Sequence, residues 1–293
     1  MIVTKTLMEM PIHRILFLGF LFIAFMPITT VLAEDTAFVR TPATVFGPSG
    51  LIFTQSADTL SPGKTEAGLS VTHDHSSTDP DFTINEVSAT MALGLPGRIE
   101  LAVHAPYMFN FESHGEDNAG MEGGDLSVKW RFLDQDVDRG LPALGFSVSY
   151  FFPVGNQRRG FEPVDSWGVQ ALLIASTRAN LSRSLYDFYY VGLYADGGIF
   201  IRDIGSSDEE KHARADLGLL FPLTDSRRLQ LILEGNATVR DQAPFEGNYM
   251  AITGALRYVT SHIHFSGGIQ HRFKQDSGIQ DTDRFVFQAG YLF

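Results

Sequence analysis

The chain has 293 residues, a formal net charge of −12 and no cysteine. The acidic balance disfavours nucleic-acid binding, and the lack of cysteine excludes structural disulfides and thiolate chemistry. Hydrophobic residues make up 44% of the chain, yet the mean hydropathy is only +0.01, and no run after the N-terminal region is long and apolar enough for a helical membrane span.

The N-terminal region has the three parts of a secretory signal peptide. Lys5 and Arg14 supply a basic start, residues 15–27 are almost entirely apolar, and small residues lead up to a cleavage site near Ala33. The apolar run is about 13 residues long, shorter than the ~20 that a spanning helix needs, which favours a cleaved peptide over a transmembrane anchor. We therefore predict a signal peptide over residues 1–33.

Residues 34–63 fit no membrane-spanning strand. Apolar residues such as Phe38 and Phe53 argue against a free solvated tail, whereas glycine and proline break the stretch into short pieces. We expect this N-terminal leader segment either to fold back into the lumen as a plug, to pack on the periplasmic mouth, or to remain a loosely ordered leader.

From residue 64 onward, apolar and polar residues alternate with the period of 2 that is typical of strands with one face in water. Each segment is about 9–13 residues long, as a tilted membrane-spanning strand requires. The predicted strands are 64–74, 83–94, 98–110, 124–133, 142–153, 166–178, 186–200, 211–222, 228–240, 248–259, 262–273 and 283–293.

The strands predict an all-β fold, a transmembrane antiparallel up-and-down β-barrel of twelve strands over residues 64–293. Two of them do not resolve into faces: 166–178 is apolar on both, and 186–200 shows no clear alternation. The connections alternate between short and long, as in barrels with short periplasmic turns and longer outer loops, so both termini are expected on the periplasmic side. The long links are acidic, which is typical of solvated loops or of a mouth that attracts cations.

The polar face of the strands carries charges of both signs, which in a closed barrel must pair or meet water. Such residues either line a solute path or form a salt-bridged filling, and twelve strands lie between the filled eight-stranded and the water-filled sixteen-stranded barrels. The lumen-facing candidates are Arg98, Glu100, Asp125, Lys129, Arg131, Arg214, Asp216, Glu234, Arg257, Arg272 and Arg284.

The last strand ends the chain on an aromatic residue. Phe285, Phe287, Tyr291 and Phe293 fall on its apolar face, and this pattern resembles the terminal strand by which outer-membrane barrels are recognised by their assembly machinery. We predict that these four residues form the assembly signal.

No motif with a catalytic or metal-binding spacing stands out. The sequence lacks G-x-S-x-G, H-E-x-x-H, a P-loop and G-x-G-x-x-G, and Gly145 to Ser149 fails the first of these at its last position. We therefore predict no catalytic residue, no metal site and no cofactor.

Two stretches carry a family resemblance. Gly124-Asp125-Leu126-Ser127-Val128 resembles the G-D-L-x-[LV] strand of an outer-membrane barrel family named for the meta-pathway of phenol degradation, and Phe151 to Asn156 resembles its F-P-T-G-[DN] motif with Val154 in place of threonine. The resemblance covers about residues 83–178. It implies a barrel that moves small, often hydrophobic or aromatic, compounds across the outer membrane.

The sequence thus predicts a channel or transporter for small solutes in the outer membrane of a Gram-negative bacterium. The expected partners are outer-membrane lipid, lipopolysaccharide, the barrel assembly machinery and a small-molecule solute. The alternatives are a closed barrel that stabilises the envelope or binds a partner, and a barrel hydrolase that acts on lipids.

Overall fold

The computed structural model describes residues 41–76, 82–113, 116–121, 123–136, 139–152, 167–180, 190–203, 209–224, 226–241, 249–274 and 282–293. The predicted signal peptide, its cleavage site and the first part of the leader lie outside these residues. Within them, no helix has the length and apolar character needed to cross a membrane.

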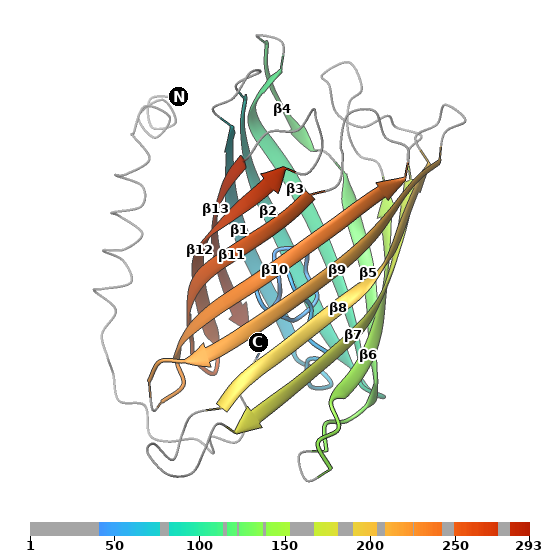
Figure 1. Ribbon diagram of the computed structural model, residues 1–293, viewed down its shortest axis with the longest axis vertical. Helices are drawn as coiled ribbons and strands as arrows, with labels where there is room; N and C mark the ends of the chain where they lie inside the picture. Colours follow the sequence, from blue (N-terminus) through green and yellow to red (C-terminus); the bar gives the residue numbers. More distant parts are fainter. Residues whose placement is uncertain are drawn as a thin grey trace. The chain divides into compact units, whose positions relative to one another are not determined.

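The described chain is built from antiparallel strands (Figure 1). Their bounds are β1 Thr65–Ser76, β2 Phe82–Leu95, β3 Ile99–Ser113, β4 Glu116–Met121, β5 Gly124–Leu133, β6 Ala143–Phe152, β7 Trp167–Asn180, β8 Tyr190–Asp203, β9 Glu209–Pro222, β10 Leu229–Asp241, β11 Tyr249–Val259, β12 Ile263–Lys274 and β13 Thr282–Leu292.

The sheet closes on itself. Each strand of the wall pairs with its neighbours in sequence, and β1 pairs with β13 in a register that runs from Glu66 opposite Leu292 to His75 opposite Asp283. In the described part of the chain the wall therefore has twelve strands, β1 to β3 and β5 to β13, and the predicted barrel is confirmed. Closure leaves the wall without the unpaired strand edge that would otherwise invite aggregation.

One short strand was missed. The sequence places residues 111–123 in a loop, but β3 continues to Ser113 and β4 pairs with its upper part, with a shift of register between Met108 and Phe111. β4 and β5 lie one after the other along β3, separated at residues 122–123. The polar sequence of β4 lacks the alternation that reveals a strand, so only its partner specifies it.

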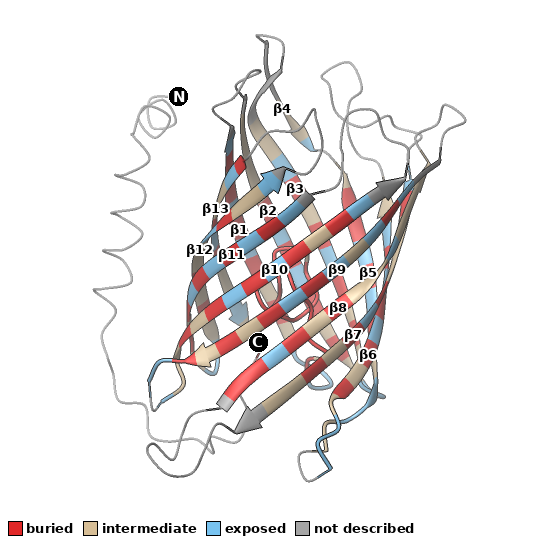
Figure 2. Ribbon diagram, in the orientation of Figure 1, coloured by how far each residue is buried: buried red, intermediate tan, exposed pale blue. Residues whose placement is uncertain are grey.

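Buried and exposed residues alternate along the wall strands (Figure 2), and the two faces differ in chemistry. Along β10, Gln230, Ile232 and Glu234 are buried, whereas Leu233 between them is exposed. Leu173 and Leu217 on the same outer face expose 61% and 67% of their surface. A continuous apolar exterior over a polar interior is typical of a barrel that faces lipid.

Candidate functional site in the barrel lumen

The barrel lumen is occupied by residues 41–60, here called the lumen segment (Figures 1 and 2). Leu51, Ile52, Thr54 and Ala57 are fully buried. The segment forms no strand or helix, but folds on itself through backbone hydrogen bonds such as that from Val45 N to Ile52 O at 3.0 Å. Buried backbone groups of an irregular loop need partners, and many of these partners lie on the barrel wall.

Carboxylates from β8 and β10 accept hydrogen bonds from the middle of the segment. Glu234 Oε1 receives the backbone N–H groups of Phe53 at 3.0 Å and Thr54 at 2.7 Å. Asp196 Oδ2 receives that of Gln55 at 2.6 Å. These two acids therefore hold three successive backbone N–H groups, which fixes the position of the segment.

A second carboxylate centre lies on β3. Glu100 accepts the backbone N–H of Ser49 at 2.8 Å through Oε1 and that of Leu60 at 2.8 Å through Oε2. Lys129 from β5 lies 3.0 Å from Glu100 and donates to the carbonyl oxygen of Ser49 at 3.1 Å. Both charged side chains are completely buried. A buried ion pair of this kind requires every polar group around it to be satisfied, and here the segment supplies the missing partners.

Cations of the wall bind carbonyl groups of the same segment. Arg257 from β11 is fully buried and donates to Gly50 O at 3.1 Å and Leu51 O at 2.7 Å. Arg214 from β9 donates to Phe53 O at 3.0 Å. The wall therefore matches the sign of its charges to the backbone dipoles of the segment.

The two ends of the segment are also attached. Ala43 donates its N–H to Glu66 on β1 at 2.9 Å and accepts a hydrogen bond from Gln288 on β13 at 2.7 Å through its carbonyl oxygen. At the other end, Asp58 forms ion pairs with Arg131 at 3.2 Å and with Arg178 at 3.0 Å.

These contacts gather in one half of the barrel, here called the turn half, which carries the turns at 96–98 and 260–262 and the points where β1 begins and β13 ends. Gly218 on β9 lets the segment approach closely, since a Cβ there would lie 2.3 Å from Leu51 Cδ1. The segment thus fills the turn half with direct contacts to the wall.

The opposite half, the loop half, has a different interior. Arg284 binds both carboxylate oxygens of Asp74, and Arg272 lies 3.9 Å from the same carboxylate. Asp216, buried nearer the middle, pairs with Arg214 and accepts from Asn236 at 2.9 Å. The charges in and near this half therefore bind one another, across neighbouring strands at Asp74 and along β9 at Asp216.

Aromatic rings also line the loop half. The ring centroids of Phe151 and Phe200 lie 5.1 Å apart in an edge arrangement, and His212 lies 5.3 Å from Phe200. These residues come from β6, β8 and β9, on the same faces as the buried polar residues Ser149, Asp196 and Asp216. They form a surface suited to stacking against a planar apolar group.

The remaining predicted lumen residues are placed as follows. Asp125 is buried and lies 2.8 Å from His104 Nδ1 on β3. Arg98 differs from the other candidates, because it occupies the turn before β3 with a φ of 63° and pairs with Asp134. Its side chain is 49% exposed, so Arg98 lies at the rim and not among the buried charged side chains that line the lumen.

The aromatic residues of the last strand lie on the predicted face. Phe287, Tyr291 and Phe293 are exposed on the outside, and the rings of Tyr291 and Phe293 pack 4.8 Å apart. Phe285 is half-buried beside His73, with ring centroids 6.2 Å apart. Their role in assembly stays a prediction.

Most of the acidic loop positions lie outside the described residues or carry side chains that are not described. Asp74 and Asp283 are exceptions, since both belong to strands, and Asp283 pairs with His271 at 2.7 Å. The acidic mouth therefore stays a prediction.

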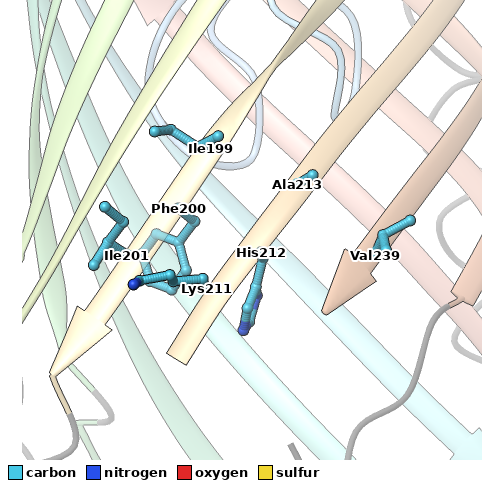
Figure 3. A pocket seen from close by; sticks show the side chains of 7 residues that line it. All are labelled: Ile199, Phe200, Ile201, Lys211, His212, Ala213 and Val239. Atoms are coloured by element: carbon cyan, nitrogen blue, oxygen red, sulfur yellow. The ribbon is translucent and has the colours of Figure 1, made fainter. Parts of the chain in front are cut away.

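A pocket of about 380 Å³ lies in the wall at β8, β9 and β10 (Figure 3). Ile199 and Val239 line it on the exposed apolar face, with Ala213 between them, whereas Phe200 and His212 line it from the inward face. The pocket therefore borders two of the aromatic residues of the loop half.

Sequence reasoning missed several residues that hold the segment, among them Glu66, Asp196, Ser176 and Gln288. Glu66 and Gln288 lie on the polar faces of predicted strands. They would have been found if the lumen-facing candidates had included every polar residue on those faces and not only a set of charged ones. Asp196 lies in the strand whose faces did not resolve.

No protein-family model and no curated protein matches the chain. Among solved structures, it is similar to an outer membrane channel from Pseudomonas putida F1, with a TM-score of 0.61 and 13% sequence identity over 81% of this chain and 98% of that one. It is also similar to the NanC porin, with a TM-score of 0.52 and 8% identity over 76% and 98% of the two chains. At these identities the likeness establishes the fold, that of an outer-membrane β-barrel; membership of the phenol meta-pathway family stays a prediction.

Proposed function

We propose that the protein is a channel for small solutes in the outer membrane of a Gram-negative bacterium, and that the lumen segment keeps it closed in the state described here. The observation that carries the proposal is the combination of a lipid-facing apolar wall with a polar lumen filled by a segment rather than by wall side chains alone. The channel and porin structures of similar fold support this reading.

The proposals for export and assembly are based on the sequence patterns at the two ends of the chain. We propose that the signal peptide is removed near Ala33 and that the leader 34–63 then acts as a separate functional unit, of which residues 41–60 lie within the barrel. The assembly machinery would recognise the terminal strand through Phe293 and its neighbours, and lipid would contact the outer face. We propose no catalytic step for this chain.

We further propose that the preferred solutes are hydrophobic or aromatic. Phe151, Phe200 and His212 offer stacking surfaces inside the loop half, and Arg214 and Asp216, which follow His212 on the inward face of β9, pair with each other. A planar apolar solute gains from such rings, whereas a small ion does not. Binding of benzoate, phenol and a sugar to the purified barrel, compared by calorimetry, tests this preference; equal affinity for all three would contradict it.

A closed barrel that stabilises the envelope is the second candidate. The fully buried Lys129–Glu100 pair favours it, because a permanently filled lumen accounts for that pair without any transport.

Single-channel recording separates the two. The mature chain should show rare or small openings, and a form that begins at Ser61 should show steady conductance. Heat-modifiable gel mobility establishes that both forms are folded. A folded short form without conductance would contradict the channel and leave the structural barrel.

A further inference from the structure

The barrel wall recognises the lumen segment largely through the segment's backbone. Glu234 and Glu100 each accept two backbone N–H groups, and Arg257 donates to two successive carbonyl oxygens. Acids meet N–H groups and cations meet carbonyl groups, so the wall is complementary to a polypeptide as such. This seat consists of Glu66, Glu100, Lys129, Asp196, Glu234 and Arg257.

Side chains of the segment add polar contacts at a few places within the described residues. Ser49 Oγ donates to Glu100 at 2.9 Å, and Asp58 pairs with two arginines. Thr54 is fully buried, and its N–H makes one of the shortest bonds to the wall, 2.7 Å to Glu234. At Thr54 the wall therefore binds the backbone directly.

The link between the segment and β1 is exposed. Residues 61–64 lie on the surface, and Gly63 adopts a φ of 81° with open space around its Cβ position. Nothing in this link contributes to the seat, so the contacts that hold the segment do not depend on its covalent attachment to the barrel.

We propose that the seat is a peptide-binding site, which the lumen segment occupies as an intramolecular ligand and which a free peptide of the same sequence can fill. The ligand class is a short polypeptide loop that presents its backbone to the wall. This inference takes from the proposed function only the closing role of the segment. A tethered ligand has a high effective concentration, so the site is filled in the intact chain.

The experiment uses the full mature chain with a protease recognition sequence inserted between Pro62 and Gly63. The protein is folded first and cleaved afterwards, and its heat-modifiable mobility is checked before and after the cut. A fluorescent peptide of residues 41–60 is then added, and its anisotropy is followed. The cut segment can leave the barrel and does not return at a high effective concentration, so the cleaved barrel, incubated with excess peptide until exchange is complete, should take up about one peptide per barrel, and the uncut protein should bind it at least tenfold more weakly.

Two modified peptides separate backbone from side-chain recognition. N-methylation at Phe53 and Thr54 removes both N–H groups that Glu234 accepts and should weaken binding at least tenfold. Thr54→Val keeps the N–H and should bind within about threefold of the parent. In the barrel, Glu234→Gln should weaken the parent peptide, whereas Thr72→Ala, on an inward position of the loop half, should not.

The inference is overturned if the cleaved barrel takes up no labelled peptide, or if the N-methylated peptide binds as well as the parent. Conductance of the cleaved barrel is recorded in parallel. Peptide uptake without any conductance would overturn the channel and leave the seat intact. Conductance without peptide uptake would overturn the seat and leave the channel intact.

Discussion

The two halves of the lumen satisfy their buried charges in different ways. In the turn half, Glu100, Glu234 and Arg257 bond to the backbone of the lumen segment. In the loop half, Asp74 and Arg284 bond to each other across adjacent strands. The difference teaches that inward charges of the same barrel can either hold a separate segment in the lumen or pair with other charges of the wall. The strand pattern alone does not separate the two uses.

The largest expected effect comes from breaking the turn half. Lys129→Met leaves Glu100 buried without its cation, which should lower the free energy of unfolding by about 3–5 kcal/mol and release the segment around Ser49. Urea unfolding in lipid and hydrogen exchange of residues 49–60 measure the two effects. Thr72→Ala, on a buried inward position of β1 in the loop half, serves as the control.

The outer face supplies the next effect. Leu173 lies in the middle of β7 and points to lipid, so Leu173→Arg should destabilise the barrel by ~2–4 kcal/mol. Gln170→Arg on the inward face of the same strand should cost much less. Equal losses in an unfolding assay in bilayers would mean that the two faces are assigned wrongly.

The loop half should respond more weakly. Arg284→Met removes one cation from Asp74, but Arg272 remains beside that carboxylate and the site is partly open to water, so the expected loss is about 1–2 kcal/mol. Exchange of the lumen segment should stay unchanged. Release of the segment by this substitution would erase the distinction between the halves.

The smallest effect on stability is expected at the C-terminus. Phe293 is largely exposed, so its deletion should barely alter unfolding in detergent. The amount of barrel in the outer membrane of growing cells should nevertheless fall. Normal surface levels of the shortened chain would contradict the assembly role.

Most of the wall could be predicted from the sequence, because a strand with one apolar and one polar face shows a side-chain pattern that repeats every two residues. The predicted strand 124–133 coincides with β5, and the other boundaries shift by a few residues. The path of the leader could not be predicted, because the wall holds it by backbone groups that every sequence has.

The ambiguous strand 166–178 has a physical explanation. In β7, Leu172 and Ile174 point inward and pack with Ala57 of the segment and Ala143 of β6, while Leu173 between them faces out. The strand is apolar on both faces because it meets lipid on one side and an apolar part of the segment on the other. Two apolar residues on the inward face of a strand, in an otherwise polar lumen, thus indicate that another part of the protein packs against them.

Ala43 has a consequence for how the molecule is made. Through its two backbone groups it links the first strand of the wall to the last, at the seam where the sheet becomes a cylinder. Joining that seam and seating the leader therefore favour each other by the same free energy. A newly made chain with an empty interior would therefore hold its first and last strands together less tightly than one in which residues 41–60 fill the lumen.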